Sequence, residues 1–330
     1  MQAMTMGRLH TAAEERLLGE VRRYMREIVG DPAAHTETGA VIGSALGTAG
    51  KMLRARLLLE CAAFGPDAYA RRDRLCMLAA MVELVHLASL VHDDIIDDAP
   101  LRRGCPSVQS RYGKDAAVYA GDLMIARVFL CAAQEGLADA AACLAGTIEE
   151  MCAGEIGQAA CRYREDTGTD EYFANIRGKT ASLFRAACVL GAAETGCTDS
   201  VLRRLGCFGE TLGILFQLHD DLLDFSGREA GKETHRDFQD GIYTLPVLLA
   251  LQSSGGRAAL LPLMRGSRER QLTGDELRRM EREVVRHGGV EQSWAVICRY
   301  LETGGALLDT FEDGEPLRTL RKVWCQLGRR

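Results

Sequence analysis

The chain has 330 residues, of which 47% are hydrophobic and 26% charged, and its formal net charge is -6 at pH 7. No concentrated basic block accompanies this acidic balance, so the composition argues against nucleic acid as a partner. The opening segment, MQAMTMGRLHTAAEERLLGE, lacks the apolar core of a signal peptide, and the most apolar stretch, 129–148, is interrupted by Gln134, Glu135 and Asp139. These features predict a cytoplasmic protein with no membrane span.

Proline and cysteine usage narrows the fold class. Only 7 prolines occur, and none lies between Pro106 and Pro246, which favours long uninterrupted helices. No alternation of strands and helices, hairpin series or repeat is visible. The 12 cysteines form no Cys-x-x-Cys pair, as expected for buried, reduced thiols in a reducing compartment. The sequence therefore predicts an all-α protein.

The first hundred residues contain three predicted helices, at 8–29, 53–64 and 72–98. A glycine-rich stretch, 39–47, is expected to be an irregular link between the first two. Lys51 and Arg54 open the second helix, three residues apart, so both cations project from one side of a helix start that attracts anions. Taken alone, two such cations are more often ordinary surface residues.

The third predicted helix ends in an acidic motif, Asp93-Asp94-Ile95-Ile96-Asp97-Asp98, just before Pro100. Residues four apart on a helix share a face, so Asp93 and Asp97 lie on one face, and Asp94 and Asp98 lie on another. Acids at the C-terminal end of a helix are disfavoured by the helix dipole. A motif in so unfavourable a place predicts a site for divalent cations.

A second copy supports this interpretation. His219-Asp220-Asp221-Leu222-Leu223-Asp224 ends another predicted helix, 201–225, with the same order of residue types. A single acidic run is usually a solvated helix end, but two matched copies behind apolar helices favour metal binding.

Cations follow the first motif at once. Arg102 and Arg103 lie beyond Pro100, which suits a ligand with both metal-bound and free anionic oxygens, such as a diphosphate. His86 lies about 20° from Asp93 on a helical wheel of 100° per residue. It is therefore either a core histidine or a site residue.

The rest of the chain predicts helices at 119–135, 139–162 and 170–191, and a polar surface loop at 226–241. Gly178-Lys179-Thr180 is not a phosphate-binding P-loop, because the preceding glycine and strand are missing. From Gly266 onward, amphipathic helices carry no recognisable chemistry.

Seven motifs, in order along nearly the whole chain, resemble those of the trans-isoprenyl (polyprenyl) diphosphate synthase family, medium- or long-chain type. They are GKMLR (50–54), ELVHLASLVHDDIIDDAPLRRGCP (83–106), GDLMIAR (121–127), GEIGQA (154–159), GKTA (178–181), FQLHDDLLDF (216–225) and GKETHRDFQDGIYTLP (231–246). The resemblance implies one all-α domain over residues 1–330, a large helical bundle around a deep central cavity. It also implies a homodimer, with the two aspartate motifs facing each other across the cavity mouth.

The resemblance further implies a role for each matching residue. Metal ligands, for Mg²⁺ with Mn²⁺ as a possible substitute, would be Asp93, Asp94 and Asp97 (the first motif) with Asp220, Asp221 and Asp224 (the second motif). Arg102, Lys179 and Lys232 match residues that hold the diphosphate of an allylic substrate. Lys51, Arg54, His86 and Arg103 match the site for isopentenyl diphosphate, and Thr180 and Gln217 match polar residues near the reacting carbons.

The implied activity is prenyl transfer. An allylic diphosphate primer would condense head-to-tail with isopentenyl diphosphate to give a longer all-trans polyprenyl diphosphate. Ionising an allylic C–O bond requires the departing charge to be neutralised, which metal ions do as Lewis acids. Ala88 and Ser89 match the floor of the chain-length cavity; because both are small, we expect a product longer than geranylgeranyl, in the hexaprenyl to octaprenyl range.

The chain departs from the family pattern at two positions, and two alternative functions share parts of that pattern. Ile242 stands where the family commonly has lysine, and His235 replaces a common glycine, so weaker allylic diphosphate binding or altered loop closure is expected. A class I terpene cyclase would share the fold but normally lacks the isopentenyl site and the second motif. A non-catalytic partner subunit of a heteromeric synthase would typically lose one motif, and both are present.

Overall fold

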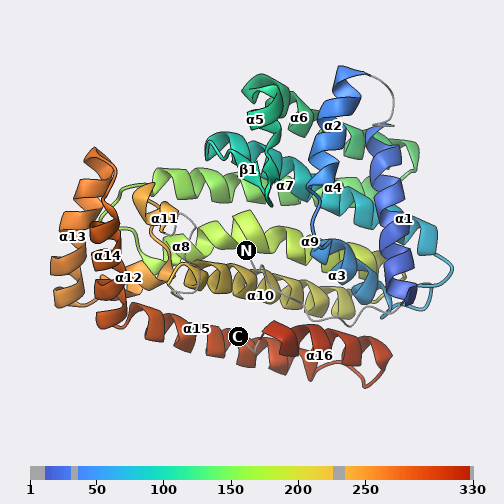
Figure 1. Ribbon diagram of the computed structural model, residues 1–330. Helices are drawn as coiled ribbons and strands as arrows, with labels where there is room; N and C mark the ends of the chain where they lie inside the picture. The colour runs from blue at the N-terminus through green and yellow to red at the C-terminus, as the bar shows by residue number, and fades with distance from the viewer. Residues whose placement is uncertain (1–11, 31–35, 226–234, 328–330) are drawn as a thin grey trace. The chain divides into compact units, whose positions relative to one another are not determined.

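Helices dominate the structure, and the all-α prediction is confirmed. The computed structural model describes residues 12–30, 36–225 and 235–327 (Figure 1). These residues fall into two compact units. The first contains residues up to 148, 183–209 and 313–326, and the second contains 149–182, 210–312 and the last residues. The expected single domain around a central cavity stays a prediction.

The first unit contains most of the N-terminal helices. Its elements are α1 (Ala12–Val29), α2 (Glu37–Gly47), α3 (Leu53–Ala62), α4 (Arg72–Ile96), β1 (Leu101–Arg102), β2 (Cys105–Pro106), α5 (Val108–Tyr112), α6 (Lys114–Gln134), nearly all of α9 (Ser182–Glu194) and α16 (Glu315–Leu327). α4 packs against α1, α3 and α6. Side chains such as Met81, Leu84 and Ala88 are completely buried. α4 is therefore the core helix that carries the first motif at its end.

The second unit contains α8 (Thr169–Ile176), the π-helical turn η1 (Arg177–Ala181), α11 (Arg236–Gln239), α12 (Leu245–Ala250), α13 (Ser254–Glu269), α14 (Gly274–Arg286) and α15 (Gly289–Leu308). α12 packs against α15, α14 and α8. Two further helices, α7 (Ala138–Ala160) and α10 (Asp199–Leu223), contribute residues to both units.

The expected link at 39–47 is wrong, because these residues form helix α2. The side chain of Thr36 caps the helix by accepting a hydrogen bond from the Gly39 backbone nitrogen at 3.0 Å. Gly39, Ile42 and Ala45 are buried, and α2 packs against α5 and α6. Tertiary packing and the cap outweigh the low helix propensity of glycine.

A short hairpin follows the first motif. β1 and β2 are antiparallel, with Arg102 opposite Cys105. The two turn residues, Arg103 and Gly104, both have positive φ, at 53° and 80°. Two consecutive positive φ values are typical of a type I′ turn, which matches the twist of a tight hairpin. The hairpin fixes the directions of Arg102 and Arg103.

Among the helices that the structure describes, α4 and α6 are long and apolar enough by length and composition to cross a membrane. The apolar window of α4 is 72% buried inside the protein, as in the core helix of a globular fold. The window of α6 is only 33% buried, so much of its apolar surface is uncovered in the single chain.

Candidate active site

The first motif lies at the C-terminal end of α4, with its carboxylates in different environments. Asp97 is exposed and Asp93 is partly buried, whereas Asp94 is buried. Oδ1 of Asp94 accepts hydrogen bonds from Nε and Nη2 of Arg102, at 2.9 and 2.5 Å. Because Arg102 lies on β1, this ion pair ties the hairpin to the motif.

A cluster of cations lies in the same unit, around the start of α3. The guanidinium of Arg103 donates to the Thr48 carbonyl at 2.6 Å and lies directly against Gly50, where an added Cβ would be 2.0 Å from Nη1. Any side chain at Gly50 would displace Arg103. Arg54 is buried and lies over the Phe184 ring at 4.5 Å, and its Nε has no hydrogen-bond partner.

Burial and mutual repulsion shift the pKa values of these groups. Burial, with repulsion from Arg103, lowers the pKa of Arg54 to about 10, although Glu83 opposes the shift. Burial and three nearby arginines hold the pKa of His86 well below its usual value. His86 is therefore neutral at pH 7 and can bind an anion only as a hydrogen-bond donor.

The second motif lies at the end of α10, in the second unit. Asp220 is exposed and Asp224 is partly buried, but Asp221 is buried. Oδ1 of Asp221 accepts from Nε2 of Gln217 at 2.8 Å, and Oδ2 accepts from the hydroxyl of Tyr172. The hydroxyl of Thr180 in turn donates to Oε1 of Gln217 at 2.8 Å. In both motifs, therefore, the carboxylate of the second aspartate accepts hydrogen bonds from other side chains.

The same burial changes the acidity of Asp221. Burial raises its pKa to about 7, against the opposing hydrogen bonds from Tyr172 and Gln217, and nearby Asp237 and Asp220 add to the increase. Burial, followed by the charge of Asp221, raises the pKa of Tyr172 well above its usual value. Tyr172 is therefore a hydrogen-bond donor at neutral pH.

Lys179 projects from the π-helical turn η1 and is ion-paired with Glu155 of α7, at 2.8 Å. Two glycines allow this close approach. A Cβ on Gly178 would lie 2.5 Å from the Glu150 carbonyl oxygen, and one on Gly154 would lie 2.5 Å from the Lys179 nitrogen. The glycines of the GEIGQA and GKTA motifs thus bring Lys179 and Glu155 together.

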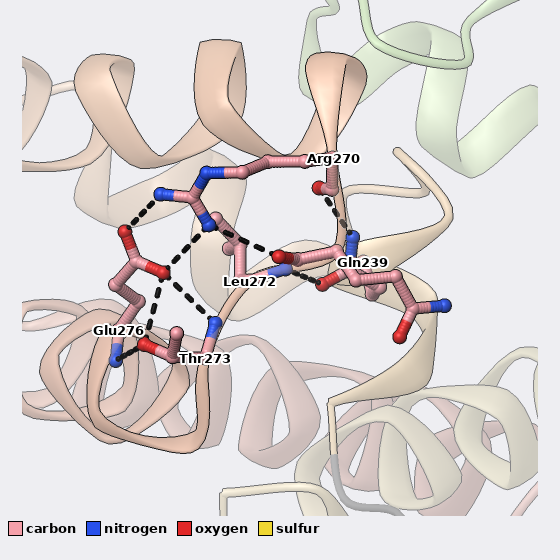
Figure 2. A network of polar contacts seen from close by, with 6 residues as sticks. Gln239, Arg270, Leu272, Thr273 and Glu276 are labelled. Carbon is pink, nitrogen blue, oxygen red and sulfur yellow. Dashed lines mark hydrogen bonds and ion pairs between the residues drawn. The ribbon is translucent and has the colours of Figure 1, made fainter.

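The segment that follows the polar loop is firmly anchored. Figure 2 shows the side chain of Gln239 bridging the connection between α13 and α14: its Nε2 donates to the Arg270 carbonyl at 3.2 Å, and its Oε1 accepts from the Leu272 nitrogen at 2.6 Å. The Arg270 guanidinium pairs with Glu276, which also closes the capping box of α14 with Thr273. This network holds the turn that carries Asp237 and Ile242. Lys232 lies outside the described residues.

Comparisons with known proteins point to one family. The polyprenyl synthetase family model matches residues 36–277. Heptaprenyl diphosphate synthase component 2 of Geobacillus stearothermophilus is 38% identical over 283 residues, covering 85% of this chain and 86% of that protein. The chain belongs to the polyprenyl synthetase family.

Solved structures agree with this assignment. Geranylgeranyl pyrophosphate synthase from Lactobacillus brevis has a TM-score of 0.88 at 28% identity, covering 98% of both chains. A polyprenyl synthase from Caulobacter crescentus, complexed with calcium and isoprenyl diphosphate, has a TM-score of 0.85 at 29% identity, covering 96% of both chains. The predicted enzyme class, a prenyltransferase of the polyprenyl diphosphate synthase type, is confirmed. The family acts on isopentenyl and allylic diphosphates and uses divalent metal ions.

The carboxylates of this family member fit such an ion. Within the described ranges, no group of three or more His, Cys, Asp or Glu side chains could enclose a metal. The candidate donors are instead exposed or partly buried aspartates at the ends of α4 and α10. Mg²⁺ takes one or two carboxylates and completes its shell with water and phosphate oxygens, so an open donor set suits it.

The two chain-length candidates differ in burial. Ala88 is completely buried in α4, whereas Ser89 is partly exposed and donates its hydroxyl to the His86 carbonyl at 2.8 Å. Met124 and Val128 are completely buried in α6, which packs against α4.

Three site residues were not identified from the sequence: Glu83, Glu155 and Tyr172. Glu83 and Glu155 lie inside quoted motifs, and Tyr172 lies seven residues before Lys179. Their partners are 24 to 49 residues away in the chain, so no local pattern signals them.

Proposed function

We propose that this polyprenyl synthetase elongates an allylic diphosphate with isopentenyl diphosphate, in the presence of Mg²⁺, to a product longer than geranylgeranyl diphosphate. The observation that carries the proposal is the cation cluster around α3. A buried guanidinium without an acceptor at Nε, as in Arg54, lacks a hydrogen bond that an anion would supply. Lys51, Arg103 and neutral His86 would complete this anion site.

Each remaining residue has a role consistent with its surroundings. Asp93 and Asp97 would hold metal ions at the end of α4, and Asp220 and Asp224 would hold metal ions at the end of α10. Bound Mg²⁺ would neutralise the charge of the departing diphosphate. Asp94 and Asp221 contribute mainly through hydrogen bonds, since Arg102 engages the first and Tyr172 and Gln217 engage the second.

Arg102, Lys179 and Lys232 match family residues that hold the allylic diphosphate, and we assign them that role. Thr180 and Gln217 would present hydroxyl and amide oxygen dipoles to the reacting carbons. Their positions are fixed by the hydrogen-bonded chain from Thr180 through Gln217 to Asp221.

The proposed product length is based on the small side chains of Ala88 and Ser89. The heptaprenyl synthase relative supports a product in the hexaprenyl to octaprenyl range. Incubation with Mg²⁺, farnesyl diphosphate and radiolabelled isopentenyl diphosphate, followed by product chromatography, tests the reaction and the length together. Absence of any elongated product in the presence of metal would overturn the proposal, and a product ending at geranylgeranyl would overturn the length.

We also propose a cytoplasmic homodimer formed through α6. Val118, Tyr119 and Leu130 are large apolar side chains exposed on this helix, and Tyr119 is 72% exposed. An uncovered apolar helix face of this kind is typical of a subunit interface. The heptaprenyl relative is named as one component of a synthase, so a heteromer is the alternative assembly. Light scattering of the purified chain, together with its activity without any added protein, distinguishes the two.

A further inference from the structure

Glu83 is a buried carboxylate of α4 that lies beside the cation cluster. Its side chain is only 5% exposed. Oε1 accepts a hydrogen bond from the Ala55 backbone nitrogen at 2.9 Å, and the backbone of Arg54 also donates to the carboxylate. Both donors belong to the first turn of α3, 28 and 29 residues earlier in the chain.

The start of α3 has no cap of its own. The residue before the helix, Met52, is in the left-handed conformation, with φ 53° and ψ 47°, and makes no side-chain capping bond. The first backbone N–H groups of a helix need acceptors, particularly when they are buried. Glu83 supplies that acceptor from another helix.

The charge of Glu83 also matters to its neighbours. Arg54 and Arg103 both attract the carboxylate, and two guanidinium groups held close together without an intervening acid would repel each other. Burial alone raises the pKa of Glu83, while the Ala55 hydrogen bond and the charge of Arg54 lower it.

We propose that Glu83 is a positioning residue for the isopentenyl diphosphate site: it caps α3 and holds the Arg54 and Arg103 guanidinium groups in the arrangement that binds the diphosphate. The inference rests on the proposed function, because it assigns the cation cluster to that substrate. Glu83 does not touch the substrate itself; it acts through Arg54 and Arg103.

The proposal explains why a carboxylate is needed. A glutamine would keep one acceptor oxygen but would place an NH₂ group among donors and cations. An aspartate would keep the charge but, being one methylene shorter, would no longer reach the α3 backbone. Glu83→Gln and Glu83→Asp therefore test charge and reach separately.

The experiment compares both variants with Glu194→Gln, which removes another partly buried acid of the first unit, one that pairs with Arg74 at 2.7 Å. KM for isopentenyl diphosphate, KM for farnesyl diphosphate and kcat are measured, with the melting temperature and the calorimetric Kd for isopentenyl diphosphate. For Glu83→Gln we expect KM and Kd for isopentenyl diphosphate to rise about tenfold or more, with KM for farnesyl diphosphate and kcat within about twofold of wild type. Glu194→Gln should lower the melting temperature without changing either KM.

The outcomes are distinct. Unchanged isopentenyl diphosphate binding in a folded Glu83→Gln protein overturns the inference, as does an equal loss for both substrates. If Glu83→Gln does not fold, Glu83→Asp decides, and an unchanged KM for isopentenyl diphosphate in that variant overturns the inference. Wild-type protein that neither binds nor consumes isopentenyl diphosphate would instead overturn the proposed function.

Discussion

The hydroxyl group of Tyr172 on α8 donates a hydrogen bond to Oδ2 of Asp221 on α10, across 49 residues of sequence. Tyr172→Phe removes this donor and leaves a buried carboxylate oxygen without it. Hydrogen bonds to charged groups contribute about 1.5–3 kcal/mol, so we expect the free energy of unfolding to fall by roughly 1–3 kcal/mol in urea titrations. Turnover should also fall, since Asp221, which accepts the hydrogen bond from the Gln217 amide, loses a fixed donor. Tyr300→Phe, a partly buried tyrosine stacked on Phe173, is the control and should change neither quantity.

The stability contributed by Asp221 should depend on pH. Its pKa is raised from 3.8 to about 7 in the folded chain, mainly by burial. The folded state therefore binds this proton more tightly than the unfolded state, and the stabilisation is full below about pH 4 and lost as pH rises to about 7. In metal-free protein, the unfolding free energy of wild type minus that of Asp221→Asn should fall between about pH 4 and about pH 7 and stay constant above that interval. A value of this difference that rises with pH would contradict the assignment.

The exposed and partly buried aspartates should be required for catalysis but not for folding. Asp93→Ala and Asp220→Ala should each lower kcat by several orders of magnitude, because they remove proposed metal ligands. Melting temperatures should hardly change, since acids at the C-terminal end of a helix are disfavoured by the helix dipole and neither Asp93 nor Asp220 is fully buried. Turnover by wild-type enzyme after rigorous chelation would exclude the metal-assisted mechanism.

Ile242 offers a test by gain of function. It is partly buried, and its backbone nitrogen donates to the Asp237 carbonyl at 2.7 Å, within the segment that Gln239 anchors. Ile242→Lys should lower KM for the allylic substrate, because a charge-assisted contact with phosphate is worth about 1.5–3 kcal/mol. Ile242→Leu is the control. An unchanged KM in the lysine variant would mean that this side chain does not face the diphosphate.

Product length should respond to bulk on α4. Ser89→Phe is expected to shorten the product, because a ring there would lie only about 6 Å along the helix axis from Asp93. Ala88→Phe should shorten it too, but Ala88 is completely buried, so overpacking should also cost about 1–3 kcal/mol of stability. Product chromatography gives the readout. If neither variant shortens the product, the floor lies elsewhere.

Helical periodicity located most of the long helices, and the motifs placed the aspartates at helix ends. α2 was missed because its three glycines suggest a loop, whereas the Thr36 cap and burial against neighbouring helices are tertiary facts. The hairpin was missed because Arg103-Gly104 is not a common turn pair, and only the structure shows two positive φ angles there.

The candidate site was predictable where a residue's role follows from its own type. Acids in a repeated motif and cations beside them indicate metal and phosphate without a structure. Positioning groups were not predictable in this way. Glu83 and Tyr172 act through hydrogen bonds to distant segments, and nothing in the spacing of neighbouring residues distinguishes them from an ordinary core acid or an ordinary core aromatic residue.

The π-helical turn η1 interrupts what would otherwise be one α-helix from Thr169 to Glu194. Its hydrogen bonds run between residues five apart, so the turn holds one residue more than a regular α-helix would. Deleting that residue would let the helix close into regular α-geometry while the segments on either side keep nearly their present faces, because the wide turn accommodates the extra residue locally. The chain could shorten here and still fold, while Lys179 and Thr180 would no longer share the register that brings them to Glu155 and Gln217. A change in length at this place would therefore be nearly silent in stability and evident in catalysis.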